Sequence, residues 1–374
     1  MTPLSRLCAD GVGRTPGPLA AVCMLLLLFV AGACAPVLRP PELTADLLAE
    51  EGRKQKELAV ELYHRRQLRL ARVARRLRVD GAGLCGGRTV PYYGALIRSR
   101  RDINEEFRDA ATAVLGLGEG LTVEMVVEGG AAERAGLREG DRVLAINGEA
   151  ASKREDLGRL LARVEDGRAR FSVERDGTGM DVIVEAEKAC AYPVGLQIQD
   201  AVNAFADGRA VVVTTGMLRF VENDDELAQV VAHEISHNVL SHVHKQQGNY
   251  LLGRILGALL DVGAQSAGVN TGRTGEALGA SIGAGMASKG FEAEADYLGA
   301  YMAARAGFDI SVAPTLWRRM AVEHPSSIAG GFMASHPSTP ERALALEETI
   351  EEILAKRDRG EALEPARIDD ASRR

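Results

Sequence analysis

The chain has 374 residues, of which 46% are hydrophobic and 26% are charged, and its formal net charge is −7. The length predicts two or three domains, and the composition is typical of a globular protein and excludes a disordered or collagen-like chain. The acidic balance and an aromatic content of 4% argue against nucleic acid as a partner, because such binding uses positive charge and stacking side chains, although a local basic patch stays open.

Residues 1–33 have the pattern of a signal peptide. An apolar run at 21–30 follows a polar, arginine-containing segment and is too short to span a bilayer. Small residues then precede Cys34, which resembles a bacterial lipobox, where the signal is removed before the cysteine and the thiol carries lipid. With Ala35 next, this resemblance implies an outer-membrane lipoprotein that faces the periplasm and is held to the membrane by a lipid anchor. An ordinary signal peptide, with Cys34 incidental, is the alternative.

Residues 34–112 are predicted to contain a long helix and then a connector. Between 42 and 78, leucine and valine recur at helical spacing without proline, which predicts an amphipathic helix. Seven arginines and no acid lie between Arg65 and Arg78. Contact with anionic lipid headgroups and an ordinary solvated helix face are both consistent with this cluster.

The cysteines fit an exported chain. Of the five, Cys8 and Cys23 lie in the predicted signal and Cys34 is the predicted lipid attachment site. Cys85 and Cys190 remain, and in an oxidising compartment two thiols predict one disulfide. That bond would join the two ends of the next module and contribute roughly 4–5 kcal/mol. Two buried free thiols are the alternative.

Residues 113–188 change to short alternating strands. Asn147-Gly148 and Asp176-Gly177 are hairpin signals, and leucines between 157 and 161 predict a helix between the strands. The string AGLREGDRVLAINGE at 135–149 resembles a PDZ domain of the bacterial protease-associated kind. The resemblance implies peptide binding along a sheet edge, and a degenerate fold that binds nothing is the alternative.

A metal-binding motif lies on the next predicted helix. His233 and His237 are four residues apart, so both imidazoles lie on one helix face and can reach one ion. Glu234 lies one residue round, where a carboxylate can take a proton from water at the metal. Two imidazoles and a carboxylate suit a zinc ion with one open position.

Two further histidines follow this motif. His244 lies seven residues beyond His237, about 10 Å along a continuous helix, so it cannot reach the same ion unless the helix breaks. His242 would face the opposite side of such a helix. We assign both to surface or packing roles.

The third metal ligand must come from another segment. Residues 290–299 predict a second helix, on which Glu292 and Asp296 are one turn apart and share a face while Glu294 points away. Glu292 can therefore bind the metal, and Asp296 can hydrogen-bond to a ligand imidazole. A solvated acidic helix face is the alternative.

The strings HEISH (233–237), FEAEAD (291–296) and ASHPSTPER (334–342) together resemble the zinc metallopeptidase family that includes HtpX, BepA and the CAAX prenyl proteases, in its soluble periplasmic branch. The resemblance covers about residues 195–350. It implies that His233, His237 and Glu292 hold one zinc ion and that Glu234 is the catalytic base. It also implies that Asp296 hydrogen-bonds to one of the metal-binding imidazoles. It also places His336 near the site, as an oxyanion donor or at the open metal position.

The predicted fold class is α+β. We expect a mainly helical zincin-type metallopeptidase domain with a small sheet at 195–356, preceded by the PDZ-like β-rich domain and the long N-terminal helix. In the small sheet, 211–216 is expected to be a buried strand and 203–205 an edge strand on which substrate adds.

Three more features of this region are predicted. Residues 250–288 are predicted to form a helical pair whose loop at 268–275 is a lid over the active-site cleft. A loosely packed core helix is the alternative. A last helix is expected from Thr339 to about Lys356, and the tail 357–374 is expected to be disordered.

The predicted function is that of a zinc-dependent metalloendopeptidase that hydrolyses peptide bonds in proteins, in quality control of the cell envelope. The partners are protein or peptide substrates, the membrane through the lipid anchor, and envelope assembly proteins, with no nucleic acid. One alternative is a PDZ-containing periplasmic chaperone or assembly factor with a silent or repressed zinc site. A scaffold that works through the PDZ module alone is another.

Overall fold

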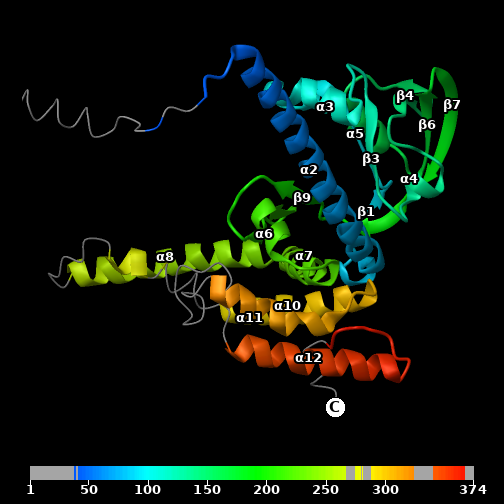
Figure 1. Ribbon diagram of the computed structural model, residues 1–374. Coiled ribbons are helices and arrows are strands. Elements are labelled where there is room, and N and C mark those ends of the chain that lie inside the picture. The colour runs from blue at the N-terminus through cyan, green and yellow to red at the C-terminus, as the bar shows by residue number, and fades with distance from the viewer. Residues whose placement is uncertain are drawn as a thin grey trace, which may run out of the picture. The chain divides into compact units, whose positions relative to one another are not determined.

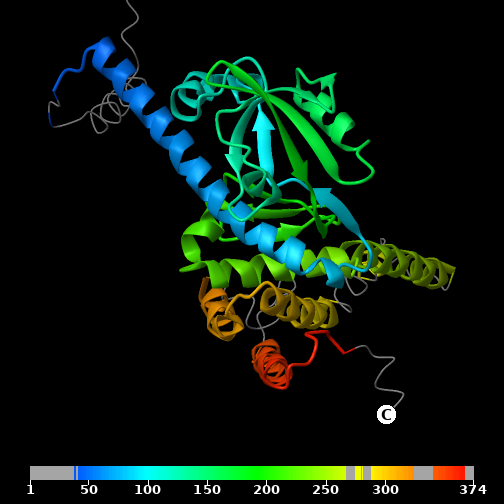
Figure 2. The same cartoon turned by 90° about the vertical axis from the view of Figure 1, so that its right-hand side faces the viewer.

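The computed structural model describes residues 38, 41–266, 274–278, 280, 288–323 and 340–366. It divides into two compact units, Met1–Gly52 and Arg53–Arg374. The predicted signal peptide, Cys34, His336 and most of the predicted lid loop lie outside the described residues. The elements described below are drawn in Figures 1 and 2.

The predicted N-terminal helix is present as α2, Ala45–Asp80. Its C-terminal half packs into the core through Leu70, Val73 and Leu77. Most of its arginines make contacts within the protein, listed here by partner: Arg69 and Arg72 with Asp224, Arg75 with Glu187, Arg76 with the Ala306 carbonyl and Arg78 with the Cys190 carbonyl. These contacts argue against the lipid interpretation for those five side chains.

A six-stranded sheet forms the PDZ-like domain. Its order is β2 (Ala95–Arg98), β3 (Thr122–Val126), β4 (Arg142–Ile146), β6 (Arg168–Arg175) and β7 (Thr178–Glu185), and β5 (Glu149–Ala150) pairs with β4. The helices of this part of the chain are α3 (Arg108–Leu115), α4 (Ala131–Arg134) and α5 (Arg154–Leu161). Because β2 pairs with β3, the sheet starts within the segment that sequence analysis assigned to the connector, before residue 113.

Both predicted hairpin turns are present in this sheet. Asn147 and Gly148 have φ values of 52° and 84°, and Asp176 and Gly177 have 50° and 76°. Two consecutive positive φ angles match the twist of the flanking strands, and asparagine, aspartate and glycine are the residues that adopt them most readily.

The two ends of the PDZ-like domain are joined. Strand β1 (Thr89–Tyr92) precedes it and pairs antiparallel with β8 (Glu187–Cys190), which follows it. Cys85 and Cys190, the predicted pair, are fully buried and form a disulfide with their Cα atoms 5.8 Å apart. The module therefore leaves and returns to the rest of the protein at one place.

The C-terminal half of the chain has a small sheet covered by helices. The sheet has the order β10 (Ala204–Ala206), β11 (Val211–Thr214) and β9 (Val194–Gln197), so the predicted buried strand is central and the predicted edge strand is at an edge. The helices are α6 (Thr215–Phe220), α7 (Asp224–Val239), α8 (His242–Ser266), α10 (Ser288–Arg305), α11 (Ala313–Glu323) and α12 (Pro340–Asp358). In both ribbon views α10 and α11 lie between α7 and α12.

The prediction of a disordered tail from Arg357 is wrong for its first ten residues. Helix α12 runs to Asp358, and residues 361–366 fold back along it and α10. The Ala366 amide donates to the Tyr297 hydroxyl at 3.1 Å, and the Lys356 ammonium donates to the Glu364 carbonyl at 2.9 Å. These contacts order a segment whose charged composition alone predicted disorder.

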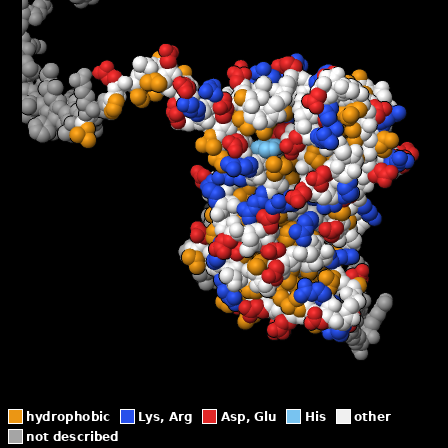
Figure 3. Space-filling model, turned by 45° about the vertical axis from the view of Figure 1, so that its right-hand side comes forward, with side chains coloured by type: hydrophobic (Ala, Val, Ile, Leu, Met, Phe, Trp, Pro, Cys, Tyr) orange, Lys and Arg blue, Asp and Glu red, His pale blue; other side chains and the backbone are white. Residues whose placement is uncertain are grey.

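Within the described ranges, none of the helices combines the length and apolar character that a membrane crossing needs. On the face drawn in Figure 3, acidic and basic side chains alternate, and neither sign forms a continuous patch.

Candidate metal centre

The centre is built on α7, which is buried on all sides. Asn223 caps its N-terminus by accepting a hydrogen bond from the Glu226 amide at 2.8 Å, and acids occupy its first turn, where they complement the helix dipole. Every residue from Glu226 to Asn238 is buried. A helix that is enclosed in this way belongs to a core, so its polar side chains His233, Glu234 and His237 have a fixed setting.

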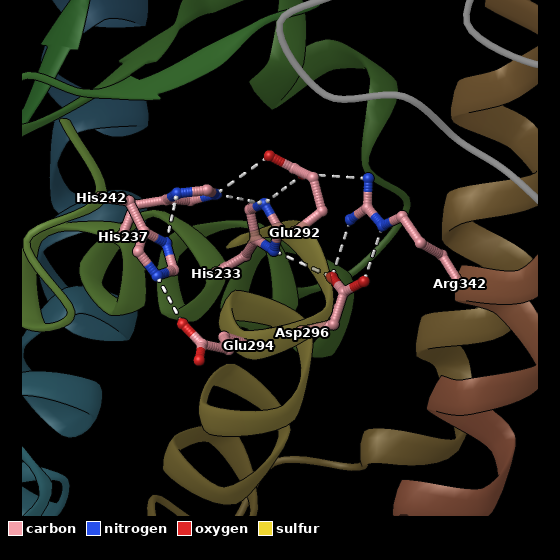
Figure 4. Close-up of polar contacts among 7 residues, drawn as sticks. All are labelled: His233, His237, His242, Glu292, Glu294, Asp296 and Arg342. Atoms are coloured by element: carbon pink, nitrogen blue, oxygen red, sulfur yellow. Dashed lines mark hydrogen bonds and ion pairs between the residues drawn. The ribbon is translucent and has the colours of Figure 1, made fainter. Parts of the chain in front are cut away.

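Three donor atoms converge on one point. The Nε2 atoms of His233 and His237 are 3.0 Å apart, and the Glu292 carboxylate oxygens lie 3.4 Å from the first and 3.5 Å from the second. Two ligands at tetrahedral angles around zinc are separated by about 3.3 Å, given metal–ligand distances of about 2.0–2.1 Å. This triangle therefore has the dimensions of one face of a zinc site (Figure 4).

A glycine brings the third ligand within reach. Glu292 lies on α10, which packs directly against α7, and a Cβ atom at Gly299 would lie 3.1 Å from the His233 backbone nitrogen. Any larger residue would therefore push the two helices apart. The close approach places Glu292 and Asp296, one turn apart on the same face, against the imidazole of His233. The shared face was predicted, but which imidazole Asp296 contacts was not.

The surroundings of the triangle favour a cation. The Asp296 carboxylate lies 2.9 Å from His233 Nδ1, which leaves Nε2 for the metal. Burial opposes a charged imidazole, but hydrogen bonds to Asp296 and Glu292 outweigh it and raise the pKa of His233 to about 10. Two imidazole nitrogens and one carboxylate, all buried and close together, are a donor set that zinc prefers, so the residues present fit the metal.

Two family models match the chain. One described as peptidase family M48 matches residues 181–350, and one described as PDZ domain matches residues 122–175. The chain contains a peptidase family M48 domain.

Curated relatives and a solved structure resemble parts of the chain. Mitochondrial metalloendopeptidase OMA1 of Schizosaccharomyces pombe is 32% identical over 42% of this chain and 46% of that protein. Beta-barrel assembly-enhancing protease of Escherichia coli O157:H7 is 34% identical over 39% of this chain and 31% of that protein. The structure of HtrA-type protease AlgW with decapeptide is 28% identical over 27% of this chain and 30% of that chain, with a TM-score of 0.22. The chain spans less than half the length of these two relatives.

Arg342 is a residue of the M48 domain's centre that sequence analysis missed. It lies in the first turn of α12, and its guanidinium bonds to both oxygens of Asp296 at 2.7 and 2.8 Å and lies 3.0 Å from a Glu292 oxygen. Burial works against ionisation of Asp296, but Arg342 and His233 outweigh it and lower the pKa of that carboxyl. The guanidinium therefore favours the charged form of Asp296 in a buried place and lies against the Glu292 carboxyl as well. Its position in the string 334–342 was its only signal.

We expect Arg342→Met to lower the free energy of unfolding of the metal-free protein by about 3–5 kcal/mol, because the change leaves two buried carboxylates without their cation. Denaturant unfolding measures this cost. The matched control is Arg318→Met, which removes an exposed ion pair with Glu347 and should leave the midpoint nearly unchanged. Equal midpoints for the two variants would contradict this account of Arg342.

His242 is buried, in line with a packing role, but the prediction that it faces away from His237 is wrong. Helix α7 ends at Val239, Ser241 takes the left-handed conformation with φ 59°, and His242 begins α8. The break turns His242 back onto the M48 centre, where its Nδ1 lies 3.1 Å from His237 Nδ1. His244 is exposed, as expected. Neither glycine nor proline marks the break, so little in the sequence indicates it.

Of the two remaining predicted site residues, the structure describes Glu234 but not His336. Glu234 follows His233 on α7 and is buried, with 3% of its surface exposed, and its role as a base stays a prediction. His336 lies outside the described residues, and its role stays a prediction.

Proposed function

We propose that the M48 domain is a zinc-dependent endopeptidase that cuts peptide bonds in proteins. The observation that carries the proposal is the triangle of His233, His237 and Glu292, with Glu234 on the same helix turn. Its support from similarity is that the relatives named above are themselves a metalloendopeptidase and a protease. A silent zinc site in a chaperone is not favoured, because each residue that hydrolysis needs is present.

In this proposal the residues have separate tasks. His233, His237 and Glu292 would hold one zinc ion, which supplies a Lewis acid that polarises the scissile carbonyl and makes water more acidic. Glu234 accepts a proton from the attacking water and delivers it to the leaving amine. Asp296 keeps the proton of His233 on Nδ1, and Arg342 keeps Asp296 charged while its guanidinium holds the Glu292 carboxyl in place.

The edge strand β10 is the proposed docking place for substrate. It pairs with β11 on one side only, and the turn between them is fixed to α7 beside His237: the Gly208 amide donates to Asn238 Oδ1 at 2.7 Å, and Asn238 Nδ2 donates to the Ala210 carbonyl at 2.9 Å. An extended peptide that adds to this edge is therefore held in a fixed relation to the catalytic helix. The PDZ domain, whose sheet ends in β2 and β7, is proposed to bind a second segment of the same protein.

We propose the cell envelope as the place of action. The apolar run at 21–30 and Cys34 support a signal peptide and a lipid anchor in the outer membrane, and the disulfide suits an oxidising compartment. The substrates proposed are misfolded envelope proteins, and the partners are envelope assembly proteins, in line with the name of the beta-barrel assembly-enhancing protease.

The test is metal removal and return on the full chain. Casein hydrolysis should stop when zinc is removed with 1,10-phenanthroline, and about one equivalent of zinc per chain should restore it. Full activity after zinc removal, or no hydrolysis by the zinc-loaded protein, would reject the proposal. In the latter case, loss of all function when a short turn replaces residues 93–186 would favour the scaffold alternative.

A further inference from the structure

A hydrogen-bonded series of three side chains begins at His237, one of the three proposed metal ligands. His237 Nδ1 is 3.1 Å from His242 Nδ1, and His242 Nε2 is 3.0 Å from a Glu294 carboxylate oxygen. Figure 4 shows the three residues joined in this order by dashed lines. They come from three helices, since His237 is in α7, His242 begins α8 and Glu294 is in α10.

The protons of this series of three side chains have one consistent arrangement when His237 binds a metal. His237 Nε2 lies in the donor triangle, so its lone pair goes to the ion and its proton must be on Nδ1. That N–H donates to His242 Nδ1, which fixes the His242 proton on Nε2. This second N–H then donates to the Glu294 carboxylate. Each group has the only role that its neighbours leave open.

His242 is held rigidly in this position. Its side chain is 2% exposed, and its ring stacks on Phe291 with the centroids 4.3 Å apart and the planes 12° apart. The turn at Ser241 sets the direction in which the ring enters. A residue that only filled space there would not need a ring nitrogen aimed at each of two polar partners.

We propose that His242 and Glu294 are positioning residues for zinc: they fix the tautomer and orientation of His237 and make it a stronger ligand. Asp296 does this for His233 by direct contact, whereas Glu294 acts on His237 through a second imidazole. The inference rests on the proposed zinc site. It assigns a chemical task to a histidine and an acid for which the hydrolytic mechanism itself has none.

The Glu294 end of the series is open to small molecules. The Glu294 side chain is 49% exposed and lines a cavity of about 680 Å³ together with Val239, Tyr297 and Pro365. A small carboxylate can therefore enter and take the place of a deleted Glu294 side chain. This access makes a rescue experiment available that a buried residue would not allow.

The test measures zinc affinity by chelator competition on the purified full chain. We expect His242→Phe, which keeps an aromatic ring on Phe291, to bind zinc about 10–100-fold more weakly than the wild type. Glu294→Ala should be weakened by a smaller factor, and acetate should restore part of the loss. The control Glu351→Gln removes an exposed acid of α12 and should bind zinc like the wild type.

A double-variant comparison tests whether the residues act in series. If they do, adding Glu294→Ala to His242→Phe should weaken zinc binding little further, because the connection is already broken. The cobalt(II) visible spectrum of His242→Phe should also change, since the orientation of one ligand is released.

Wild-type zinc affinity in both His242→Phe and Glu294→Ala would overturn the inference. If His242→Phe does not fold, the zinc affinity of Glu294→Ala, measured with and without acetate, tests the inference by itself. A weakening of zinc binding that acetate does not reverse would contradict the inference. If the wild-type protein binds zinc but cuts no protein, the proposed function is rejected. The zinc affinities of the variants relative to the wild type would still test the inference about His242 and Glu294.

Discussion

Glu234→Gln is expected to reduce casein hydrolysis by at least about 10²–10⁴-fold while zinc stays bound. Glutamine has the size and shape of glutamate, so the buried place beside His233 is filled as before. Its amide has no carboxylate lone pair of comparable basicity, so it can neither take a proton from water nor return one to the leaving amine. The loss should appear in kcat, because the triangle that holds the metal is intact.

The measurement compares initial rates of the zinc-loaded variant and wild type, with metal content determined on the same samples. Glu348→Gln, at an exposed position on α12, is the matched control and should keep full activity. Equal residual hydrolysis in the Glu234→Gln variant and the wild type would defeat the enzyme interpretation. The PDZ-containing chaperone would then be the better reading.

The second large effect is expected from Glu292→Ala, which should lose the tightly held zinc. Two imidazoles remain, and the nearby Arg342 loses the Glu292 carboxylate that lies 3.0 Å from it, so the local potential becomes less favourable to a cation. The loss of affinity should exceed the roughly 10–100-fold that follows removal of a supporting partner, because a ligand itself is gone.

Metal analysis after dialysis should find about one zinc per wild-type chain and almost none in Glu292→Ala. Trp317 is the chain's one tryptophan and its ring lies 5.1 Å from that of His233, so its fluorescence offers a second readout of zinc binding. Glu351→Gln again serves as the control. A Glu292→Ala variant that retains one zinc at wild-type affinity would show that the third ligand is another residue.

The local periodicity of the sequence was sufficient to predict most of the metal triangle. His233 and His237, like Glu292 and Asp296, are one helix turn apart, and this spacing is a property of any α-helix. The hairpins at Asn147-Gly148 and Asp176-Gly177 were predictable for the same reason, since the backbone angles there depend on the residues in the turn.

The parts that sequence analysis missed depend on contacts between distant segments. Arg342 reaches Asp296 because α12 packs along α10, and a sequence pattern does not record which helices pack together. His242 was misassigned because its face was calculated for an unbroken helix, whereas the chain turns at Ser241. Strand β2 was overlooked because four residues with a register shift give no clear alternation.

The pairing of β1 with β8 makes the PDZ domain a removable insert. Tyr92 and Glu187 are opposite each other in that antiparallel pair, so the chain leaves and rejoins the rest of the protein at neighbouring positions. A short turn from Tyr92 to Glu187 would convert the two strands into an ordinary hairpin and keep Cys85 and Cys190 in place. A chain shortened in this way, or a chimaera with a foreign module spliced at the same junction, would test the proposal that the PDZ domain selects substrate while the M48 domain cuts it.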